Sequence, residues 1–207
     1  MTQWSKDYLK KRADLESKDQ AINAQGGKYG NALQAASKGG HEKIVHILLD
    51  GGADMNAQGG FCGNMLQAAS GGSHERVVGI LLDRGAEVSA QGRKYGNALQ
   101  GASRSGYEGV VQILLDRGAE VNVQGGYCSI VLQAVSYRVD EKVIQILLDK
   151  GANVNAQGGF HGSAVQAAAE GGHEKVLQVL IEKGADVAGQ GTDFQVCSRT
   201  LVRFKAM

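Results

Sequence analysis

The chain has 207 residues, of which 31 are glycine and none is proline, and its 22 basic and 21 acidic side chains give a net charge of +1. Glycine at about twice its usual share of ~7%, without any proline, excludes collagen, proline-rich linkers and mucin-like stalks. The near-neutral charge predicts neither nucleic-acid nor membrane attraction, and 43% hydrophobic residues argue against intrinsic disorder.

The start of the chain, its apolar runs and its cysteines favour a location inside the cell. The first twenty residues are charged throughout and contain no signal-peptide pattern. The apolar runs are far shorter than the ~20 residues of a membrane span. Three cysteines without paired spacing suit a reducing compartment. We therefore expect a cytoplasmic protein, with the nucleus as the alternative, and not a secreted one.

The first predicted element is a helix over about residues 4–15. Residues 21–24, Ala-Ile-Asn-Ala, then copy the end of the units that follow. We interpret residues 1–25 as an N-terminal helix and remnant repeat that cap the next element.

A strictly periodic repeat organises the rest of the chain. The pair Gln-Gly begins at Gln25 and recurs at a constant step of thirty-three positions up to Gln190, and Gly-Ala recurs at the same step from Gly52. Five complete units follow from this spacing, at residues 26–58, 59–91, 92–124, 125–157 and 158–190.

Each unit predicts two short helices and a turn. In the first unit Asn31 is placed to cap a helix over residues 32–37, which the glycine pair 39–40 ends. A second helix is expected over residues 41–50, closed by Gly52 in the left-handed conformation. The glycine-rich stretch 55–63 is predicted to form an extended turn or β-hairpin, which we term a finger. Because so small a unit cannot bury its own apolar face, the units are expected to stack as a solenoid.

The amino-acid pattern of the units resembles that of a known repeat family. From Asn31 to Ala57 the chain reads, in order, Asn-Ala-Leu-Gln, Ala-Ala, Gly-His, Ile-Val, Ile-Leu-Leu and Gly-Ala-Asp-Met-Asn. This run resembles the ankyrin repeat, which has Thr-Pro-Leu-His, Ala-Ala, Gly-His, Val-Val, Leu-Leu-Leu and Gly-Ala-Asp-Val-Asn in the same order. Asparagine keeps a cap where the family has threonine, and alanine keeps helix propensity where it has proline. The resemblance implies an all-α ankyrin-repeat solenoid of five repeats with projecting fingers and terminal caps.

The wording Gly-Asn-Ala-Leu-Gln-Ala-Ala-Ser, with Asn-Ala-Gln-Gly-Gly between units, is most similar to proline-free ankyrin arrays of fungal proteins, often in NACHT-type receptors. This resemblance implies a sensor or partner-binding array. After the fifth unit, residues 191–207 break the register, and we interpret them as a broken partial repeat that acts as a C-terminal cap. The whole chain is expected to be one domain.

The histidines and cysteines do not predict catalysis or a metal site. His41, His74 and His173 recur at one repeat position, which favours a structural hydrogen bond to a neighbouring turn. Cys62 and Cys128 lie two units apart, at about 20 Å, which is too far for a disulfide or a shared zinc ion. We predict no catalytic residue, no metal and no cofactor.

The positions that differ between units predict the binding surface. They lie in the fingers and at the ends of the first helices, where the resemblance places the concave face on which ankyrin partners dock. Tyrosine, phenylalanine, lysine and arginine on rigid turns have the composition of binding hot spots. The predicted partner-binding residues are Lys28, Tyr29, Phe61, Cys62, Lys94, Tyr95, Arg104, Tyr107, Tyr127, Cys128, Tyr137, Arg138, Phe160 and His161.

Several readings of this surface stay open. The finger aromatics also suit a small side core that packs finger on finger. In the fourth unit Ser-Ile-Val replaces Gly-Asn-Ala at 129–131 and Tyr-Arg-Val-Asp stands at 137–140, which is either drift or a specific contact.

We predict a non-catalytic, monomeric binding module with a protein partner, and no binding to nucleic acid or membrane. The alternative is a small-molecule-binding protein or an enzyme. Its site would lie in the groove between fingers and first helices, with Tyr95, Cys128, His161 and Arg138 as the candidate groups. A third reading is that the chain is a fragment of a longer array.

Overall fold

The computed structural model describes residues 17–92, 96–125, 130–138 and 140–187. Within these ranges the chain forms helices and turns and no strand, which confirms the predicted all-α class. The chain divides into two compact parts, which we call unit one (Met1–Glu87) and unit two (Val88–Met207). From here on, the thirty-three-residue units of the sequence are called repeats. No helix in the described ranges is long and apolar enough to cross a membrane. Of the predicted N-terminal cap at residues 1–25, the helix expected at 4–15 lies outside these ranges, as does the predicted C-terminal cap at 191–207, so the domain boundaries stay a prediction.

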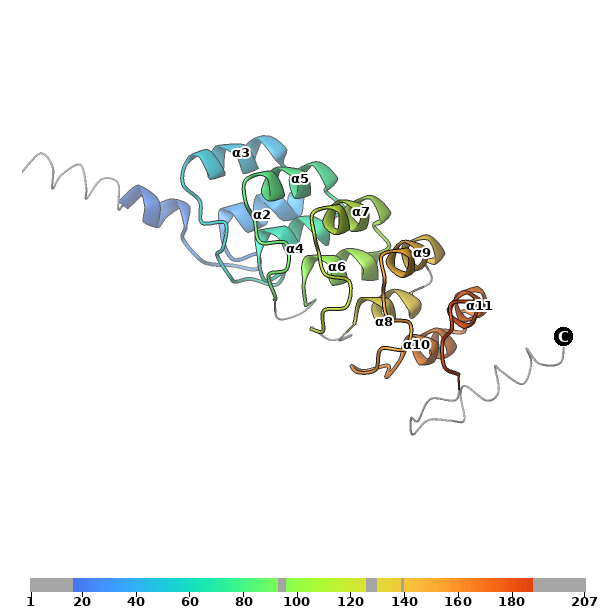
Figure 1. The fold of residues 1–207 in the computed structure, drawn as a ribbon. Coiled ribbons are helices and arrows are strands. Elements are labelled where there is room, and N and C mark those ends of the chain that lie inside the picture. The colour runs from blue at the N-terminus through green and yellow to red at the C-terminus, as the bar shows by residue number, and fades with distance from the viewer. Residues whose placement is uncertain (1–16, 93–95, 126–129, 139, 188–207) are drawn as a thin grey trace, which may run out of the picture. The chain divides into compact units, whose positions relative to one another are not determined.

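Unit one contains a helix at residues 17–22 and two helical hairpins. In each hairpin a first helix is followed by a second, and α2 packs against α4 while α3 packs against α5 (Figure 1). The four helices are α2 (Ala32–Gly39), α3 (Glu42–Asp50), α4 (Met65–Ser70) and α5 (Glu75–Asp83).

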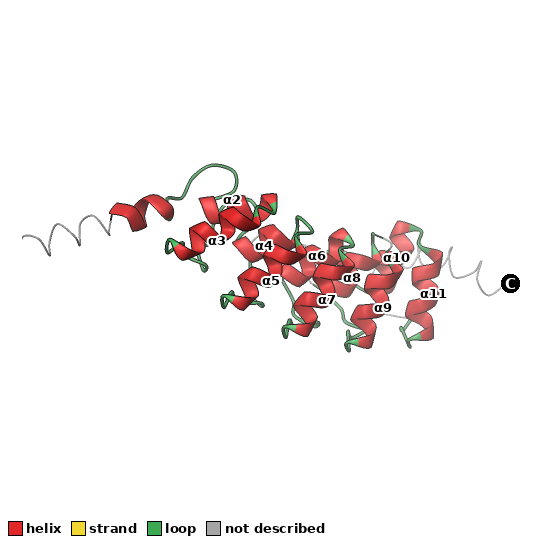
Figure 2. Cartoon of the chain, turned by 90° about the horizontal axis from the view of Figure 1, so that it is seen from above, coloured by secondary structure: helices red, strands yellow, loops and turns green. Residues whose placement is uncertain are grey.

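Unit two contains three further hairpins of the same kind. The first helices α6, α8 and α10 form one layer and the second helices α7, α9 and α11 form another (Figure 2). The six helices are α6 (Ala98–Ser105), α7 (Glu108–Asp116), α8 (Val131–Ser136), α9 (Glu141–Asp149), α10 (Ala164–Gly171) and α11 (Glu174–Glu182).

Aliphatic side chains at a fixed repeat position form the core between these layers. In the first helices of unit two, Leu99, Leu132 and Val165 are buried, and in the second helices Leu114, Leu147 and Leu180 are buried completely. Placing one aliphatic side chain at the same position of each repeat of unit two therefore gives a row of apolar contacts from one hairpin of this unit to the next.

The first helices begin with a reciprocal cap. The predicted cap is confirmed, because Asn31 Oδ1 accepts a hydrogen bond from the backbone N–H of Gln34 at 2.8 Å. Gln34 Oε1 in turn accepts from the backbone N–H of Asn31 at 2.9 Å, which completes a capping box. Asn97 and Gln100 form the same pair in unit two.

The glutamine of this box also joins one repeat to the next. The side-chain amide of Gln34 donates to the carbonyl oxygens of Ala57 at 3.1 Å and Gly63 at 3.0 Å, in the following finger. Gln100 donates to Val123 and Gly125, and Gln133 donates to Gly162 at 2.7 Å. We call this interaction the glutamine staple. It fixes the bases of the fingers that follow α2, α6 and α8 on those helices, and sequence reasoning did not foresee it.

The first two fingers are turns that are each closed by a single antiparallel bridge, not two-stranded hairpins. Gly26 pairs with Gly30, and Gly59 pairs with Gly63. The first two fingers contact each other through their backbones, since the Phe61 N–H donates to the Lys28 carbonyl at 2.9 Å. The side chains at the finger tips are therefore carried on backbone that is tied at its base and to its neighbour.

Two of the three repeated histidines, His74 and His173, make the predicted structural hydrogen bond. His74 Nε2 lies 2.9 Å from the carbonyl oxygen of Lys38, and His173 Nε2 lies 2.9 Å from that of Tyr137. Each ring thus bridges the start of a second helix to the end of the previous first helix. In the fourth repeat Asp140 takes the histidine position and instead caps α9, accepting from the Val143 N–H at 3.0 Å.

Ion pairs link the exposed ends of successive second helices. Lys150 Nζ lies 3.0 Å from Asp116 Oδ1, and Lys183 Nζ lies 3.4 Å from Asp149 Oδ1. Hydrogen bonds from Lys150 and then from Gln112 hold the pKa of the Asp116 carboxyl below its ordinary value. Because the folded-state pKa is lowered, this pair stabilises the fold above the unfolded-state pKa of about 3.9, and the contribution is lost as the pH falls through the folded-state pKa.

Replacing Lys150 with alanine is expected to raise the pKa of Asp116 toward its ordinary value. The variant removes the strongest of the hydrogen bonds that favour the ionised carboxylate. A carboxyl-carbon NMR titration of the full chain measures the pKa directly. Lys175→Ala is the matched control, since Lys175 faces Glu141 and not Asp116. An Asp116 pKa that is the same in the Lys150 variant and the wild type contradicts this assignment.

Candidate functional site

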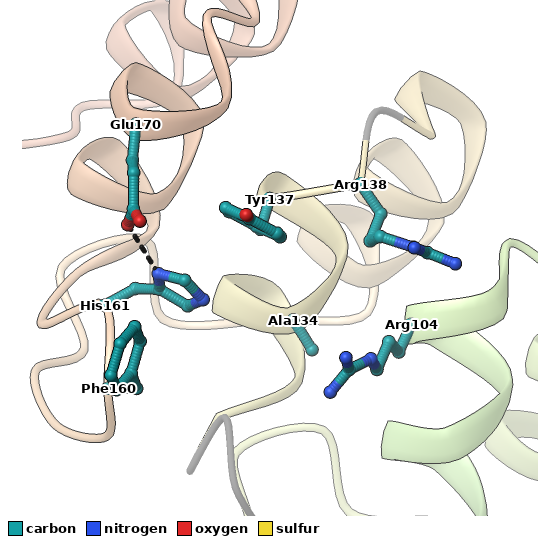
Figure 3. Close-up of a pocket in the computed structure, with 7 residues that line it drawn as sticks. All are labelled: Arg104, Ala134, Tyr137, Arg138, Phe160, His161 and Glu170. Atoms are coloured by element: carbon teal, nitrogen blue, oxygen red, sulfur yellow. Dashed lines mark hydrogen bonds and ion pairs between the residues drawn. The ribbon is translucent and has the colours of Figure 1, made fainter.

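A pocket of about 210 Å³ opens on the finger side of unit two. Its walls come from the ends of the first helices α6, α8 and α10 and from the finger of the fifth repeat (Figure 3). It is lined by Arg104, Ala134, Tyr137, Arg138, Phe160, His161 and Glu170.

Three of these side chains occupy one repeat position. Arg104, Tyr137 and Glu170 occupy the same position in three successive repeats. Arg104 and Glu170 lie near the ends of α6 and α10, and Tyr137 directly follows α8. Stacking the hairpins brings this cation, aromatic ring and carboxylate into one row, as Figure 3 shows. The pocket is thus built at a position where the repeats differ from one another.

An aromatic cluster forms the middle of the pocket. The rings of Tyr137 and His161 stack with centroids 4.5 Å apart and an interplanar angle of 21°. Phe160 meets the same imidazole edge-on, with centroids 5.1 Å apart. The His161 side chain is only 7% exposed, whereas Phe160 is 65% exposed and Tyr137 is 40% exposed. The imidazole is therefore held between two rings that themselves face solvent.

The orientation of His161 is fixed by a carboxylate. His161 Nδ1 lies 2.7 Å from Glu170 Oε2, so the Nδ1 proton is donated to the ionised carboxylate. The second ring nitrogen, Nε2, turns toward the side of the pocket where Ala134 lies (Figure 3). In the neutral imidazole this nitrogen accepts a hydrogen bond, and in the protonated one it donates.

An oriented imidazole–carboxylate pair is also half of a nucleophile-activating arrangement. Such chemistry needs a hydroxyl, thiol or amine within hydrogen-bond reach of the free ring nitrogen. Among the seven described lining residues there is no serine, threonine, cysteine or lysine, and the one hydroxyl belongs to Tyr137, whose ring stacks on the imidazole. The groups that line this pocket are suited to binding through aromatic contact, charge and hydrogen bonds.

The fourth repeat supplies three lining residues, and two of them, Tyr137 and Arg138, stand where its first helix ends differently from the others. Tyr137 and Arg138 stand where the first repeat has Lys38 and Gly39. The helix α8 therefore ends at Ser136 without the left-handed glycine that follows α2 and α6. It also begins without a side-chain cap at Ile130, as the sequence predicts. The departure that we interpreted as drift or a contact thus puts two large side chains on the pocket wall.

Unit one holds the predicted residues of the first two fingers. Lys28 Nζ lies over the Tyr29 ring, 5.4 Å from its centroid, and Phe61 is 47% exposed. Cys62 corrects the prediction, because it is buried at 6% exposure and packs at the finger base. A buried thiol cannot contact a partner, so the predicted surface does not include it.

The structure brings together five of the fourteen predicted residues, which are Arg104, Tyr137, Arg138, Phe160 and His161. Tyr107 lies at the start of α7 and does not line the pocket. Lys94, Tyr95, Tyr127 and Cys128 lie outside the described residues. Ala134 and the pairing of Glu170 with His161 were missed. Glu170 itself stands at the repeat position of Arg104 and Tyr137, among the first-helix ends that were expected to face the partner.

Comparisons with known proteins match most of the described chain. Residues 33–125 match a model of ankyrin repeats in three copies, and residues 132–181 match a model of ankyrin repeats in many copies. A segment of 34 residues is 71% identical to the azaphilone pigments biosynthesis cluster protein L of Monascus ruber. This segment covers 16% of the chain and 7% of that relative.

Proposed function

The chain belongs to the ankyrin-repeat family, whose repeats generally mediate protein–protein interactions, and from this premise we propose that it is a non-catalytic protein-binding module. Its proposed contact surface is the finger side, with the pocket of unit two as the anchor point. Tyr137, Arg138, Phe160 and His161 are the proposed anchors.

The observation that carries this proposal is the exposed aromatic cluster with adjacent arginines. Tyr137 and Phe160 keep large parts of their rings in solvent although both contact a nearly buried imidazole. Aromatic and arginine side chains dominate binding hot spots, and rings already held by packing lose little entropy on association.

The size of the pocket favours a protein partner over a small molecule. Small-molecule sites take about 300–1,000 Å³. A pocket of about 210 Å³ is smaller and suits one or two side chains of a partner. The alternative, a small-molecule-binding protein or an enzyme in this groove, therefore gains no support from the pocket.

The finer family type and the setting are proposals as well. The 71% identity to a segment of a Monascus ruber protein supports a fungal-type array. It covers too little of that relative to transfer a role in pigment formation. A monomer in the cytoplasm or nucleus, and a receptor of the NACHT type as the larger context, stay proposals from the wording of the repeats.

Replacing Tyr137, Arg138 and Phe160 together with alanine is expected to abolish partner capture, which means that the affinity for the partner falls at least a hundredfold. Each change removes a hot-spot side chain that is exposed at the pocket, so folding is expected to be retained. The measurement is co-purification of the tagged full chain after cross-linking, read by mass spectrometry for proteins and small molecules, with circular dichroism to check folding.

The matched control replaces Ile47, Lys175 and Ile181 with alanine. These side chains are also one cation and two solvent-exposed hydrophobic residues, but they lie on second helices. Partners lost from the pocket variant and kept by the control support the proposal. A pocket variant that keeps every wild-type partner rules out this surface, and a stoichiometric metabolite supports the small-molecule alternative.

A further inference from the structure

We infer that the pocket of unit two takes a tryptophan side chain of the partner protein. The indole N–H donates a hydrogen bond to His161 Nε2, and the indole ring covers the exposed parts of Tyr137 and Phe160. The inference rests on the proposed function and adds to it the residue type that the pocket recognises.

The imidazole of His161 presents a hydrogen-bond acceptor to the pocket. Its Nδ1 donates to Glu170 Oε2 at 2.7 Å, so in the neutral ring Nε2 carries a lone pair and no proton. Nε2 faces the side of the pocket where Ala134 lies (Figure 3), and among the described residues it has no hydrogen-bond partner. A ligand that covers this nitrogen without donating to it leaves the acceptor unsatisfied, which weakens binding. The pocket therefore favours a ligand that carries a donor.

The rings around this nitrogen favour an aromatic donor over an aliphatic one. Tyr137 lies within 21° of parallel to the imidazole, and Phe160 stands nearly perpendicular to it, at 88°. Both rings keep exposed surface in addition to the contacts that they make. A flat ligand that points its N–H along the imidazole plane can lie parallel to one ring and meet the other edge-on, which are the arrangements that aromatic pairs prefer. Serine, threonine and asparagine donate as well, but they cover neither ring.

The charges of the lining residues favour a neutral donor. A lysine or arginine of the partner would enter a pocket that two arginines, Arg104 and Arg138, already line. Its one carboxylate among the lining residues, Glu170, already accepts the His161 proton. Like charges placed together weaken a complex, so tyrosine and tryptophan remain as ligands. The indole N–H needs one acceptor only, whereas the phenol hydroxyl also carries lone pairs that need donors. Tryptophan is therefore the side chain that matches a single accepting nitrogen.

The test begins with a selection of phage-displayed random peptides on the immobilised full chain, with counter-selection against the variant Tyr137→Ala/Phe160→Ala. The wild-type chain is expected to enrich peptides that share one tryptophan. The best peptide, synthesised with a fluorescent label, is titrated by anisotropy, and we expect at least a tenfold loss of affinity in that variant. The matched control, Ile47→Ala/Ile181→Ala, removes two exposed apolar side chains from second helices and is expected to bind as the wild type does.

The hydrogen bond is tested by a change in the peptide alone. Benzothienylalanine keeps the shape of tryptophan but has sulfur in place of the N–H, so it covers the rings without donating. We expect the sulfur peptide to bind the wild type at least fivefold more weakly than the tryptophan peptide does. In His161→Phe, which keeps a ring but has no acceptor, both peptides are expected to bind equally. Because the two affinities are compared on one protein sample, partial unfolding of the variant does not change their ratio.

Several outcomes overturn the inference. Enriched peptides that depend on tyrosine, on a cation or on a residue without a donor assign a different ligand to the pocket. A sulfur peptide that binds the wild type as tightly as the tryptophan peptide rules out the hydrogen bond to His161. A selected peptide that still binds Tyr137→Ala/Phe160→Ala as tightly as the wild type has its site elsewhere. Each of these results leaves a protein-binding module in place. Absence of any enriched peptide rejects the inference, and the co-purification experiment then decides separately on the proposed function.

Discussion

Replacing Gln100 with alanine is expected to lower the free energy of unfolding of unit two by about 3 kcal/mol, because each buried polar group left unsatisfied costs about 1–3 kcal/mol. The variant removes the acceptor of the Asn97 N–H and the donor to the carbonyls of Val123 and Gly125. Gln100 is only 5% exposed, so bulk water does not replace these bonds freely. The loss is measured by urea unfolding followed by far-ultraviolet circular dichroism.

The chain offers a matched control for this substitution in the same repeat. Gln112 also donates a side-chain hydrogen bond, at 2.8 Å to Asp116, but the bond is exposed on α7. Gln112→Ala is expected to cost less than about 0.5 kcal/mol, as for other glutamine–aspartate pairs on helix surfaces. Equal costs for the two variants would show that the staple contributes nothing beyond an ordinary surface bond.

Replacing Gly60 with alanine is expected to destabilise unit one by about 2–5 kcal/mol, the sum of a left-handed backbone cost of about 1–2 kcal/mol and an overpacking cost of about 1–3 kcal/mol. Gly60 has φ of +60°, and an added methyl group would meet the backbone carbonyl of Tyr29 in the preceding finger. The finger must therefore shift or the contact between fingers must open. Urea unfolding measures the cost, and hydrogen exchange at the Phe61 amide reports the loss of its bond to Lys28.

Gly85→Ala separates the two contributions. Gly85 has φ of +91°, but an added methyl group would meet no atom within 4 Å. We expect only the backbone cost of about 1–2 kcal/mol, with Phe61 protected as in the wild type. If Gly85→Ala is as destabilising as Gly60→Ala, the close approach of the two fingers is not what requires glycine.

The sequence predicted those features whose partners lie within one repeat. The cap at Asn31 and the left-handed Gly52 follow from residue types a few positions apart, and both are confirmed. The cap at Asp140 had the same kind of signal, an aspartate directly before a helix, and was overlooked. The structural role of His74 was predictable in kind because the residue recurs at a helix start, although its carbonyl partner was not.

The features that were missed depend on how neighbouring segments pack. Gln34 donates to carbonyls 23 and 29 residues further along, and no local pattern identifies backbone acceptors at that distance. The pairing of His161 with Glu170 spans only nine residues, but it requires the finger to fold back onto the end of α10. The resemblance could place Tyr137, Arg138 and Glu170 together at the ends of the first helices, whereas the pocket that they line with Phe160 and His161 could not be predicted.

The glutamine staple also bears on how such a chain can change in length over evolution. Its donor and its acceptors lie in successive repeats, at sequence separations of 23, 25 and 29 residues. Duplication or deletion of one whole repeat leaves every remaining glutamine facing a finger base of the same design. A change of any other length moves the acceptors out of register and leaves buried amides without partners. Recombination in whole repeats is therefore the tolerated route, and it can place a new side chain beside the pocket without altering the framework that holds it.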